Sequence, residues 1–211
     1  MNEGLGLVLH KTEVIAALCN DTFGNIVTLD ASGLVILWKT DTGIQQSAWS
    51  IKHDQDEKVT CAAFDKSERR LLVGSNKGRV WIYNWNSGIR LNELKSEMDS
   101  DVSCVLNTVL ASKKHEIARG NTVATGWNRF VYVWHDPPDS YTLSAIKKID
   151  LHIDCDVRSM TYIQQTQQIS FAMYNGMVTT WRATGNWKNM HKIDRWRNSG
   201  LIPSIGSANS A

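Results

Sequence analysis

Short apolar runs, each opened by a valine, recur along the chain and are separated by polar, glycine-containing stretches. An aromatic residue follows each run and closes a second stretch of β-branched and apolar residues. The paired residues are Val14 and Trp38, Val59 and Tyr83, Val102 and Trp134, and Val157 and Trp181. The distance within a pair is 24 residues in the first, second and fourth units and 32 in the third. This pattern predicts one small folding unit repeated four times, because a unit of this size cannot bury its own apolar faces.

Each unit divides into four short β-type segments. The first segment is the valine-led run, and the third ends at the aromatic residue. Turn pairs such as Ser32-Gly33, Lys77-Gly78 and Asn175-Gly176 precede the third segment, where a tight hairpin is needed. The second segments are predicted at residues 26–29, 71–74, 123–125 and 169–172, and fourth segments at 44–51, 89–94 and 187–193. No stretch has a convincing helical period, so the sequence predicts an all-β chain of four-stranded antiparallel units.

Four short strands, a period in the forties and a tryptophan that closes the third strand resemble the WD40 repeat of β-propellers. The resemblance covers about residues 5–195 and implies a WD40-type β-propeller of about four four-stranded blades. No repeat has the Trp-Asp pair of the family. The resemblance also implies a buried His–Asp–Ser/Thr–Trp network in each blade. His10, Thr28 and Trp38 come closest to it, but Ser32 replaces the aspartate, so we expect no complete network and expect stability from packing between blades.

The repeats are placed at about residues 10–52, 53–97, 98–151 and 152–195, within a partial propeller over 1–198 and before a flexible tail at 199–211. Residues 5–9 are expected to form an outer fourth strand that lacks its three preceding strands. Four blades are few for this family, so we expect an incomplete propeller, truncated or split from a larger one. A four-bladed ring and closure by a second chain are the alternatives.

Composition and motifs favour a protein-interaction scaffold. The formal net charge of +2 does not by itself indicate a nucleic-acid or membrane partner. The four cysteines form no CxxC pair, which argues against structural zinc and suits a reducing compartment. We find no phosphate loop, nucleophile elbow or metalloprotease motif, so we expect no catalysis, cofactor or metal. The alternatives are a phosphorylated or nucleic-acid ligand bound through the basic stretch 187–197 and, least favoured, a hydrolase.

The cellular setting rests on a second, narrower resemblance. The stretches LLVGSNKGRVWIYNWNSG and TGWNRFVYVW are similar to blades of long WD-repeat proteins of motile cilia. This similarity implies a cytoplasmic protein of the cilium or axoneme whose partners are other proteins and further blades of the same polypeptide.

Strand parity places the links between second and third strands, and between successive blades, at one end of the molecule, here called the top face. Two large aromatic residues, Trp127 and Tyr174, fall on this face over the third and fourth repeats, with Arg129 beside the first. Acidic residues of the inter-blade loops, including Asp101 and Asp156, are expected as a solvated acidic rim around it. Because binding hot spots favour Trp, Tyr and Arg, these five residues form the candidate protein-binding site. The alternatives are burial of both rings between blades and a site at the insertion near Lys113.

Overall fold

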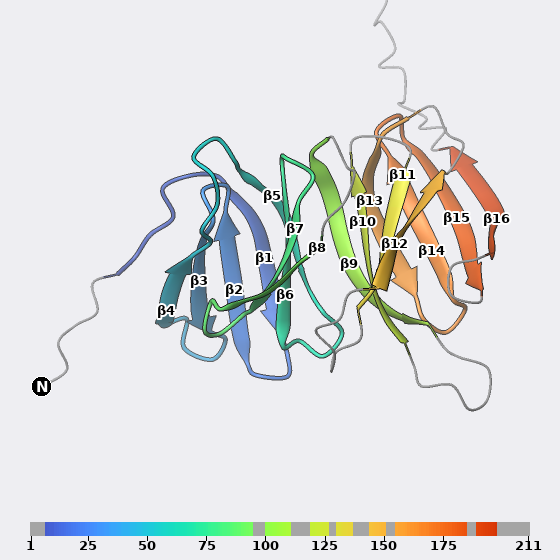
Figure 1. The fold of residues 1–211 in the computed structure, drawn as a ribbon. Helices are drawn as coiled ribbons and strands as arrows, with labels where there is room; N and C mark the ends of the chain where they lie inside the picture. Colours follow the sequence, from blue (N-terminus) through green and yellow to red (C-terminus); the bar gives the residue numbers. More distant parts are fainter. Residues whose placement is uncertain are drawn as a thin grey trace, which may run out of the picture.

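A computed structural model describes residues 7–94, 100–110, 119–126, 130–136, 144–150, 155–184 and 189–197. These residues form four antiparallel sheets of four strands each, joined in chain order, so each sheet is one blade (Figure 1). Blade 1 contains β1 (Val14–Asn20), β2 (Asn25–Asp30), β3 (Leu34–Lys39) and β4 (Gln45–Ser50), and blade 2 contains β5 (Val59–Phe64), β6 (Arg70–Ser75), β7 (Val80–Asn84) and β8 (Arg90–Leu94). Blade 3 contains β9 (Val102–Leu110), β10 (Arg119–Gly126), β11 (Phe130–His135) and β12 (Ser144–Asp150), and blade 4 contains β13 (Val157–Ile163), β14 (Gln168–Met173), β15 (Met177–Thr184) and β16 (Asn189–Arg197).

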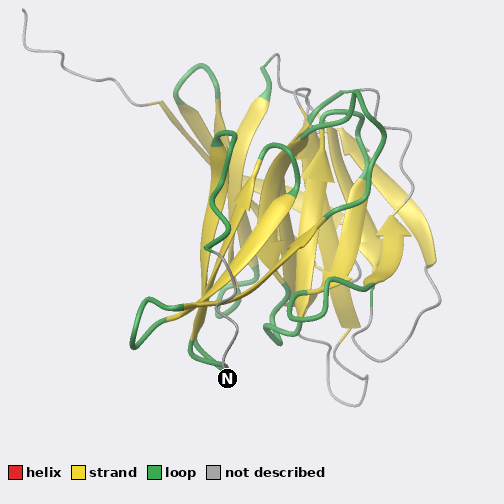
Figure 2. Cartoon of the chain, turned by 90° about the vertical axis from the view of Figure 1, so that its left-hand side faces the viewer, coloured by secondary structure: helices red, strands yellow, loops and turns green. Residues whose placement is uncertain are grey.

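The described part of the chain contains strands and turns but no helix (Figure 2). No described helix is therefore long and apolar enough to cross a membrane. The predicted all-β architecture of four four-stranded units is confirmed, and the observed strands include those predicted within the four units, with ends that differ by a few residues.

The four blades are equivalent down to the register of their strands. Each closing aromatic pairs with the corresponding position of the second strand: Trp38 with Ile26, Tyr83 with Leu71, Trp134 with Thr122 and Trp181 with Ile169. The register also shifts at two corresponding places in every blade, near the leading valine and near the closing aromatic. Because a one-residue slip would turn every side chain to the opposite face of the sheet, the shared shifts keep the same positions facing inward in all four units.

The blades stand side by side in chain order, and their first strands are neighbours. β1 contacts β5, β5 contacts β9, and β9 contacts β13, whereas no comparable contact joins β13 back to β1 among the described strands. Figure 1 shows the resulting arc, from blade 1 at the left to blade 4 at the right. We call the side of a blade that meets the next blade its front face, and the opposite side its rear face.

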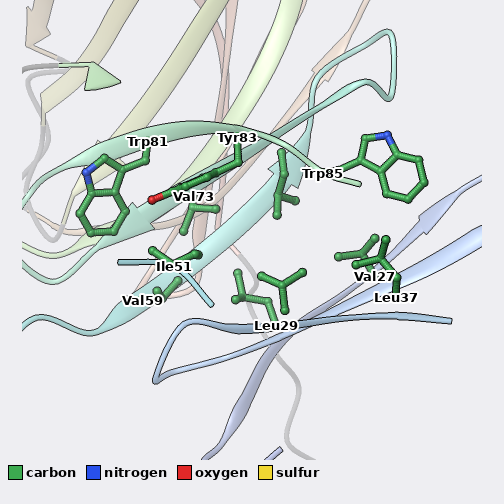
Figure 3. Packing of buried hydrophobic residues seen from close by; sticks show 11 residues of the cluster. Val27, Leu29, Leu37, Ile51, Val59, Val73, Trp81, Tyr83 and Trp85 are labelled. Atoms are coloured by element: carbon green, nitrogen blue, oxygen red, sulfur yellow. The ribbon is translucent and has the colours of Figure 1, made fainter. Parts of the chain in front are cut away.

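Apolar clusters fill the spaces between the blades, as expected. Between blades 1 and 2, the aliphatic front face of β2 and β3 packs against aromatic residues on the rear face of blade 2 (Figure 3). The labelled members are Val27, Leu29, Leu37, Ile51, Val59, Val73, Trp81, Tyr83 and Trp85. Two further clusters join blade 2 to blade 3 and blade 3 to blade 4 in the same way. In each interface the closing aromatic of the later blade lies on its rear face, against the blade before it.

The sequence predicted no complete polar network in any repeat, but blade 1 contains one. His10 contacts Asp30 Oδ2 through Nδ1 at 3.0 Å and Thr28 Oγ1 through Nε2 at 2.7 Å. Trp38 donates from Nε1 to the same hydroxyl at 2.8 Å. The expectation was wrong because the aspartate of the network is Asp30, the last residue of β2. Ser32 does not replace it but donates from Oγ to Asp30 Oδ1 at 2.6 Å.

In the other three blades the expectation of an incomplete network is confirmed. The strand register places Val73, Ala124 and Phe171 where blade 1 has Thr28. These side chains have no hydroxyl to accept a hydrogen bond from an indole or imidazole, so packing replaces the network there. Val73, Ala124 and Phe171 all lie in the inter-blade clusters with no exposed surface.

A buried ion pair also joins blades 2 and 3. Arg70 donates from Nε to Asp65 Oδ2 at 2.9 Å and from Nη1 to Asp136 Oδ1 at 2.8 Å. Thr122 donates to the other oxygen of Asp136 at 2.7 Å. Burial lowers the pKa of Arg70, but the charges and hydrogen bonds of the two carboxylates outweigh burial and raise it above its ordinary value. The guanidinium therefore stays charged and compensates the negative charges of the two buried carboxylates.

Residues 5–9 were predicted to form a strand, and the described part of this segment, residues 7–9, is not one. It is instead connected to blade 1 by side chains. Val8 donates its amide to Gln45 Oε1 at 3.0 Å, and His10 joins the network described above. Without three preceding strands beside it among the described residues, the segment has no ladder to enter.

We expect Gly74→Ala to destabilise the contact between blades 2 and 3. A Cβ atom at this position would lie 2.7 Å from both Cys61 Sγ and Val102 Cγ1, closer than packed atoms tolerate. Overpacking of this kind costs about 1–3 kcal/mol. Chemical denaturation of the variant should show a lower midpoint with an unchanged slope. An unchanged midpoint would show that β6 and β9 are not in such close contact.

Candidate protein-binding site

The top face is organised by one hydrogen bond that recurs in three blades. The first residue of the turn after the second strand donates its amide to a carbonyl of the loop that enters the same blade. The pairs are Ala31 with Glu13 at 2.9 Å, Asn76 with Lys58 at 3.0 Å and Tyr174 with Asp156 at 3.1 Å. The two kinds of link therefore meet at one end of blades 1, 2 and 4, as strand parity predicted.

Tyr174 projects from this face over blade 4. Its side chain is 67% exposed, although the turn that carries it is well defined. Gly176 has a φ of +77° and donates to the carbonyl of Met173, and Met177 donates its amide to the side chain of Asn175. Arg158 places its guanidinium 6.0 Å from the centre of the tyrosine ring. The ring of Tyr174 is therefore not buried between blades. It faces solvent together with the neighbouring guanidinium of Arg158.

The acidic members of the candidate site lie at neighbouring loops. Asp156 accepts the amide of Tyr174 through its backbone carbonyl and is half-buried. Asp101 is also half-buried and stands two residues before Ser103, whose hydroxyl donates to the carbonyl of Val157 at 2.6 Å. This bond ties the tops of blades 3 and 4 together. Asp101, Asp156 and Tyr174 therefore belong to one region, while Trp127 and Arg129 lie outside the described residues.

The top face is less acidic over blade 2 than the sequence suggested. Glu57 is 1% exposed and accepts from Ser75 Oγ at 2.6 Å, so it is not the solvated loop residue that was expected. Arg79 lies 3.3 Å from Glu57 and 3.1 Å from Asp54, and Lys77 lies 3.9 Å from the same aspartate. These cations come from the hairpin after β6, and they balance the loop acids. The predicted acidic rim therefore does not extend over blade 2, and it stays a prediction for blades 3 and 4.

The opposite end of the molecule has a pocket that the sequence did not reveal. It has a volume of about 330 Å³ and opens between the lower ends of β5, β9 and β13. Thr108 Oγ1 and Tyr162 OH are buried there without a hydrogen-bond partner, and burial raises the pKa of Tyr162. Its described lining includes one cation, Lys66, but neither carboxylate nor histidine. The residues that line it thus provide no acid–base pair.

Other sequence features have a structural explanation. Most of the basic stretch 187–197 is β16, which pairs with β15 along its whole length and so forms the predicted outer strand. Residues 111–118, which include Lys113, lie outside the described part. Among the described residues, no group of three or more His, Cys, Asp or Glu side chains could hold a metal ion.

Comparison with known proteins agrees with this geometry. The WD40 domain family of anaphase-promoting complex subunit 4 matches residues 24–109, from the second strand of blade 1 to the first strand of blade 3. The WD repeat-containing protein on Y chromosome of Drosophila mojavensis is 26% identical over 180 residues. Its Drosophila virilis counterpart is 25% identical over the same length. These matches support a WD40-repeat family for the chain.

The alignment with these two WD40 relatives covers 82% of the chain but only 14% of each relative. The chain thus corresponds to about one seventh of the length of the proteins it resembles. WD40 domains generally bind other proteins and are generally not enzymes. A finer function must be argued from the residues of the site, because one fold serves many functions.

Proposed function

We propose that this chain is a non-catalytic scaffold within a longer WD-repeat protein and that it docks a protein segment on its top face over blades 3 and 4. The exposed ring of Tyr174 is the observation that carries the proposal. An aromatic side chain held on a rigid turn loses little conformational entropy on binding, and Tyr is enriched at binding hot spots. The neighbouring Arg158 guanidinium adds a charged group that can bind backbone carbonyls or carboxylates.

The chemistry of the site favours a segment with basic and apolar character. Tyr174 supplies an exposed aromatic anchor that a bound segment would desolvate, and Trp127 and Arg129 are proposed to extend it from the neighbouring blade. Asp101 and Asp156 supply carboxylates at the edge of the same region. An apolar centre with a polar rim is the usual anatomy of a protein–protein interface.

We expect Tyr174→Ala to weaken binding of such a segment by about 2 kcal/mol, or about 30-fold in Kd. The probe is a set of peptides selected from a display library on the full wild-type chain, and affinity is measured by titration. Because the ring is exposed, the thermal midpoint of the variant should stay close to that of the wild type. Trp127→Ala should weaken the same peptides.

Ile163→Ala is the matched control. Ile163 is also an exposed apolar residue of blade 4, but it ends β13 at the opposite face. Peptides that lose affinity equally with both variants, or that bind Tyr174→Ala as tightly as the wild type, would contradict the top-face site. A lowered melting temperature of Tyr174→Ala would assign the ring a structural role instead.

The proposed cellular setting is the cytoplasm, at the cilium or axoneme. Its support is the similarity of blades 2 and 3 to long WD-repeat proteins of motile cilia. A fluorescently tagged chain, expressed in multiciliated cells within its full-length protein, should be retained in detergent-extracted axonemes. Complete release into the detergent-soluble fraction would contradict an axonemal location and leave the scaffold proposal standing.

A further inference from the structure

The pocket at the lower end of the molecule lies where three consecutive blades meet. β9 of blade 3 stands between β5 of blade 2 and β13 of blade 4 and contacts both strands. The pocket has a volume of about 330 Å³, and its lining comes from the ends of these three strands and from the turns that follow β5 and β13. This volume is at the lower end of the range of small-ligand sites, about 300–1,000 Å³.

Two hydroxyl groups line the pocket from facing sides of the junction between blades 3 and 4. Thr108 follows Asn107, which pairs with Thr122 on the rear face of blade 3, so the side chain of Thr108 points to the front face. Tyr162 is in register with Trp181 on the rear face of blade 4. Thr108 is 1% exposed, and neither hydroxyl has a hydrogen-bond partner among the described residues. Because a buried hydroxyl without a partner destabilises a protein, both groups would gain from an acceptor that enters the pocket.

Lys66 brings a positive charge to the same place from blade 2. Its backbone amide donates to Asn107 Oδ1 at 3.4 Å, and its ammonium group donates to Gln164 Oε1 in blade 4. The amide of Gln164 is neutral, and an ammonium group has three donors, so this bond leaves the charge of Lys66 uncompensated. Among the described residues of the lining no carboxylate balances it.

The other walls of the pocket are apolar. Phe64, Leu106 and Met160 contribute aromatic, aliphatic and thioether surface. Burial raises the pKa of Tyr162, so its phenol keeps its proton at neutral pH and can donate. Donors, one cation and apolar walls together suit a ligand that has an anionic acceptor at one end and hydrocarbon at the other.

We propose that this pocket binds a carboxylate carried on a short apolar chain. The carboxylate accepts hydrogen bonds from the hydroxyls of Thr108 and Tyr162 and pairs with Lys66, whose flexible stem lets the ammonium group turn inward. The hydrocarbon contacts Leu106 and Met160. A single cation with two neutral donors matches one negative charge, whereas a doubly charged phosphate is usually held by several cations.

Two sources offer this chemistry, a free carboxylic acid and the carboxyl terminus of a protein segment that ends in an apolar residue. The proposal is independent of the top-face site, because the two sites share no residue. Either one can therefore fail alone.

The test follows the methyl resonance of Met160 in the full chain, labelled at its methionine methyl groups. Isocaproate is the probe, and isocaproamide, which has the same shape without the charge, is its control. The acid should shift the Met160 resonance and bind with a Kd about tenfold lower than that of the amide. Met177 is equally buried but starts β15 at the opposite end of blade 4, so its resonance should not move.

A short acetylated peptide that ends in leucine distinguishes the two sources. It is titrated with a free and with an amidated carboxyl terminus. Binding of both isocaproate and the free-carboxyl peptide assigns the pocket to a chain terminus. Binding of isocaproate alone assigns it to a small carboxylic acid.

Three variants test the residues that carry the proposal. Thr108→Val and Tyr162→Phe each remove one hydroxyl with little change of shape, and each should weaken isocaproate binding about fivefold. Their melting temperatures should stay the same or rise, because a buried hydroxyl without a partner is removed. Lys66→Met should weaken isocaproate about tenfold and leave isocaproamide unchanged. Lys52→Met, an exposed lysine in the loop that follows β4 at the top face, should change neither.

Three outcomes would overturn the proposal. The first is equal affinity for the acid and the amide, or no shift of the Met160 resonance with either. The second is unchanged isocaproate binding by a folded Lys66→Met chain. The third is a lowered melting temperature of both Thr108→Val and Tyr162→Phe without a loss of affinity, since the hydroxyls would then serve the fold and not a ligand.

Discussion

Replacing Arg70 with methionine is expected to lower the free energy of unfolding by about 3–5 kcal/mol. The guanidinium bridges Asp65 and Asp136 from two different blades, and both carboxylates are almost completely buried. Without the cation, two negative charges would remain in the interior, and among the described residues the Ser67 and Thr122 hydroxyls and backbone amides would be left to stabilise them. Equilibrium denaturation in urea measures the loss directly.

Arg69→Met is the matched control for this prediction. Arg69 precedes Arg70 in the chain but is exposed, so its replacement should change the free energy of unfolding by less than about 0.5 kcal/mol. If Arg70→Met is as mild as Arg69→Met, blades 2 and 3 are not held together by the ion pair. The double replacement of Asp65 and Asp136 by asparagine in the Arg70→Met background should recover part of the stability, because it removes the unpaired charges.

Replacing Asp30 with alanine is expected to cost about 3 kcal/mol, because several donors lose a buried acceptor at once. Asp30 has no exposed surface and accepts from Ser32, from the amide of Leu34 and from His10. Ser32→Ala is the milder comparison, since it removes one of these donors and leaves the carboxylate in place. Thermal denaturation should rank the variants in that order, and equal midpoints would contradict the network.

The same carboxylate should make stability depend on pH. Burial by itself would raise the pKa of Asp30, but the hydrogen bonds from Ser32, His10 and Leu34 hold it below its ordinary value. A lowered pKa in the folded state means that the ionised form stabilises the fold above the unfolded pKa of about 4. That contribution is lost as pH falls through the folded pKa. The stability difference between the wild type and Asp30→Asn should therefore shrink as the pH is lowered below about 4.

A difference that stays constant over the acid range would contradict this origin. His10 is the titratable side chain in direct contact with Asp30, so the comparison is repeated in a His10→Gln background. The acid-dependent part should persist there in reduced form, because Ser32 and Leu34 still donate to the carboxylate.

The sequence was most informative where alternation of buried and exposed residues governs the structure. The valine runs, the tight turns and the closing aromatics predicted every blade, because a period of two and glycine-containing turns leave few other pairings. The polar contacts were harder to foresee. Asp30 was overlooked because a network depends on where a side chain ends in space, and Asp30 lies two residues before the expected position. The Arg70–Asp136 pair joins residues 66 positions apart, and no spacing rule connects them.

The candidate site shows the same division. Strand parity correctly placed Tyr174 at the top of blade 4, yet parity could not decide whether its ring is buried or exposed. The exposure of the ring depends on the shape of the turn and on the position of the neighbouring blade, and the sequence pattern specifies neither. The pairing of Asp54 with Arg79 was missed for a similar reason, since it joins a loop to the next hairpin. Trp127 and Arg129 stay predictions.

The position of the closing aromatics on the rear faces gives the chain a direction of assembly. A ribosome releases blade 1 before blade 2, so the aliphatic front face of blade 1 is available when Tyr83 emerges. Each new blade therefore completes its largest apolar contact with a neighbour that has already been synthesised, and Trp134 and Trp181 repeat the step. Domains generally fold in this N-to-C order during synthesis, while the ribosome adds about 5–20 residues per second. Each new blade of a nascent chain thus covers the front face that the blade before it left open.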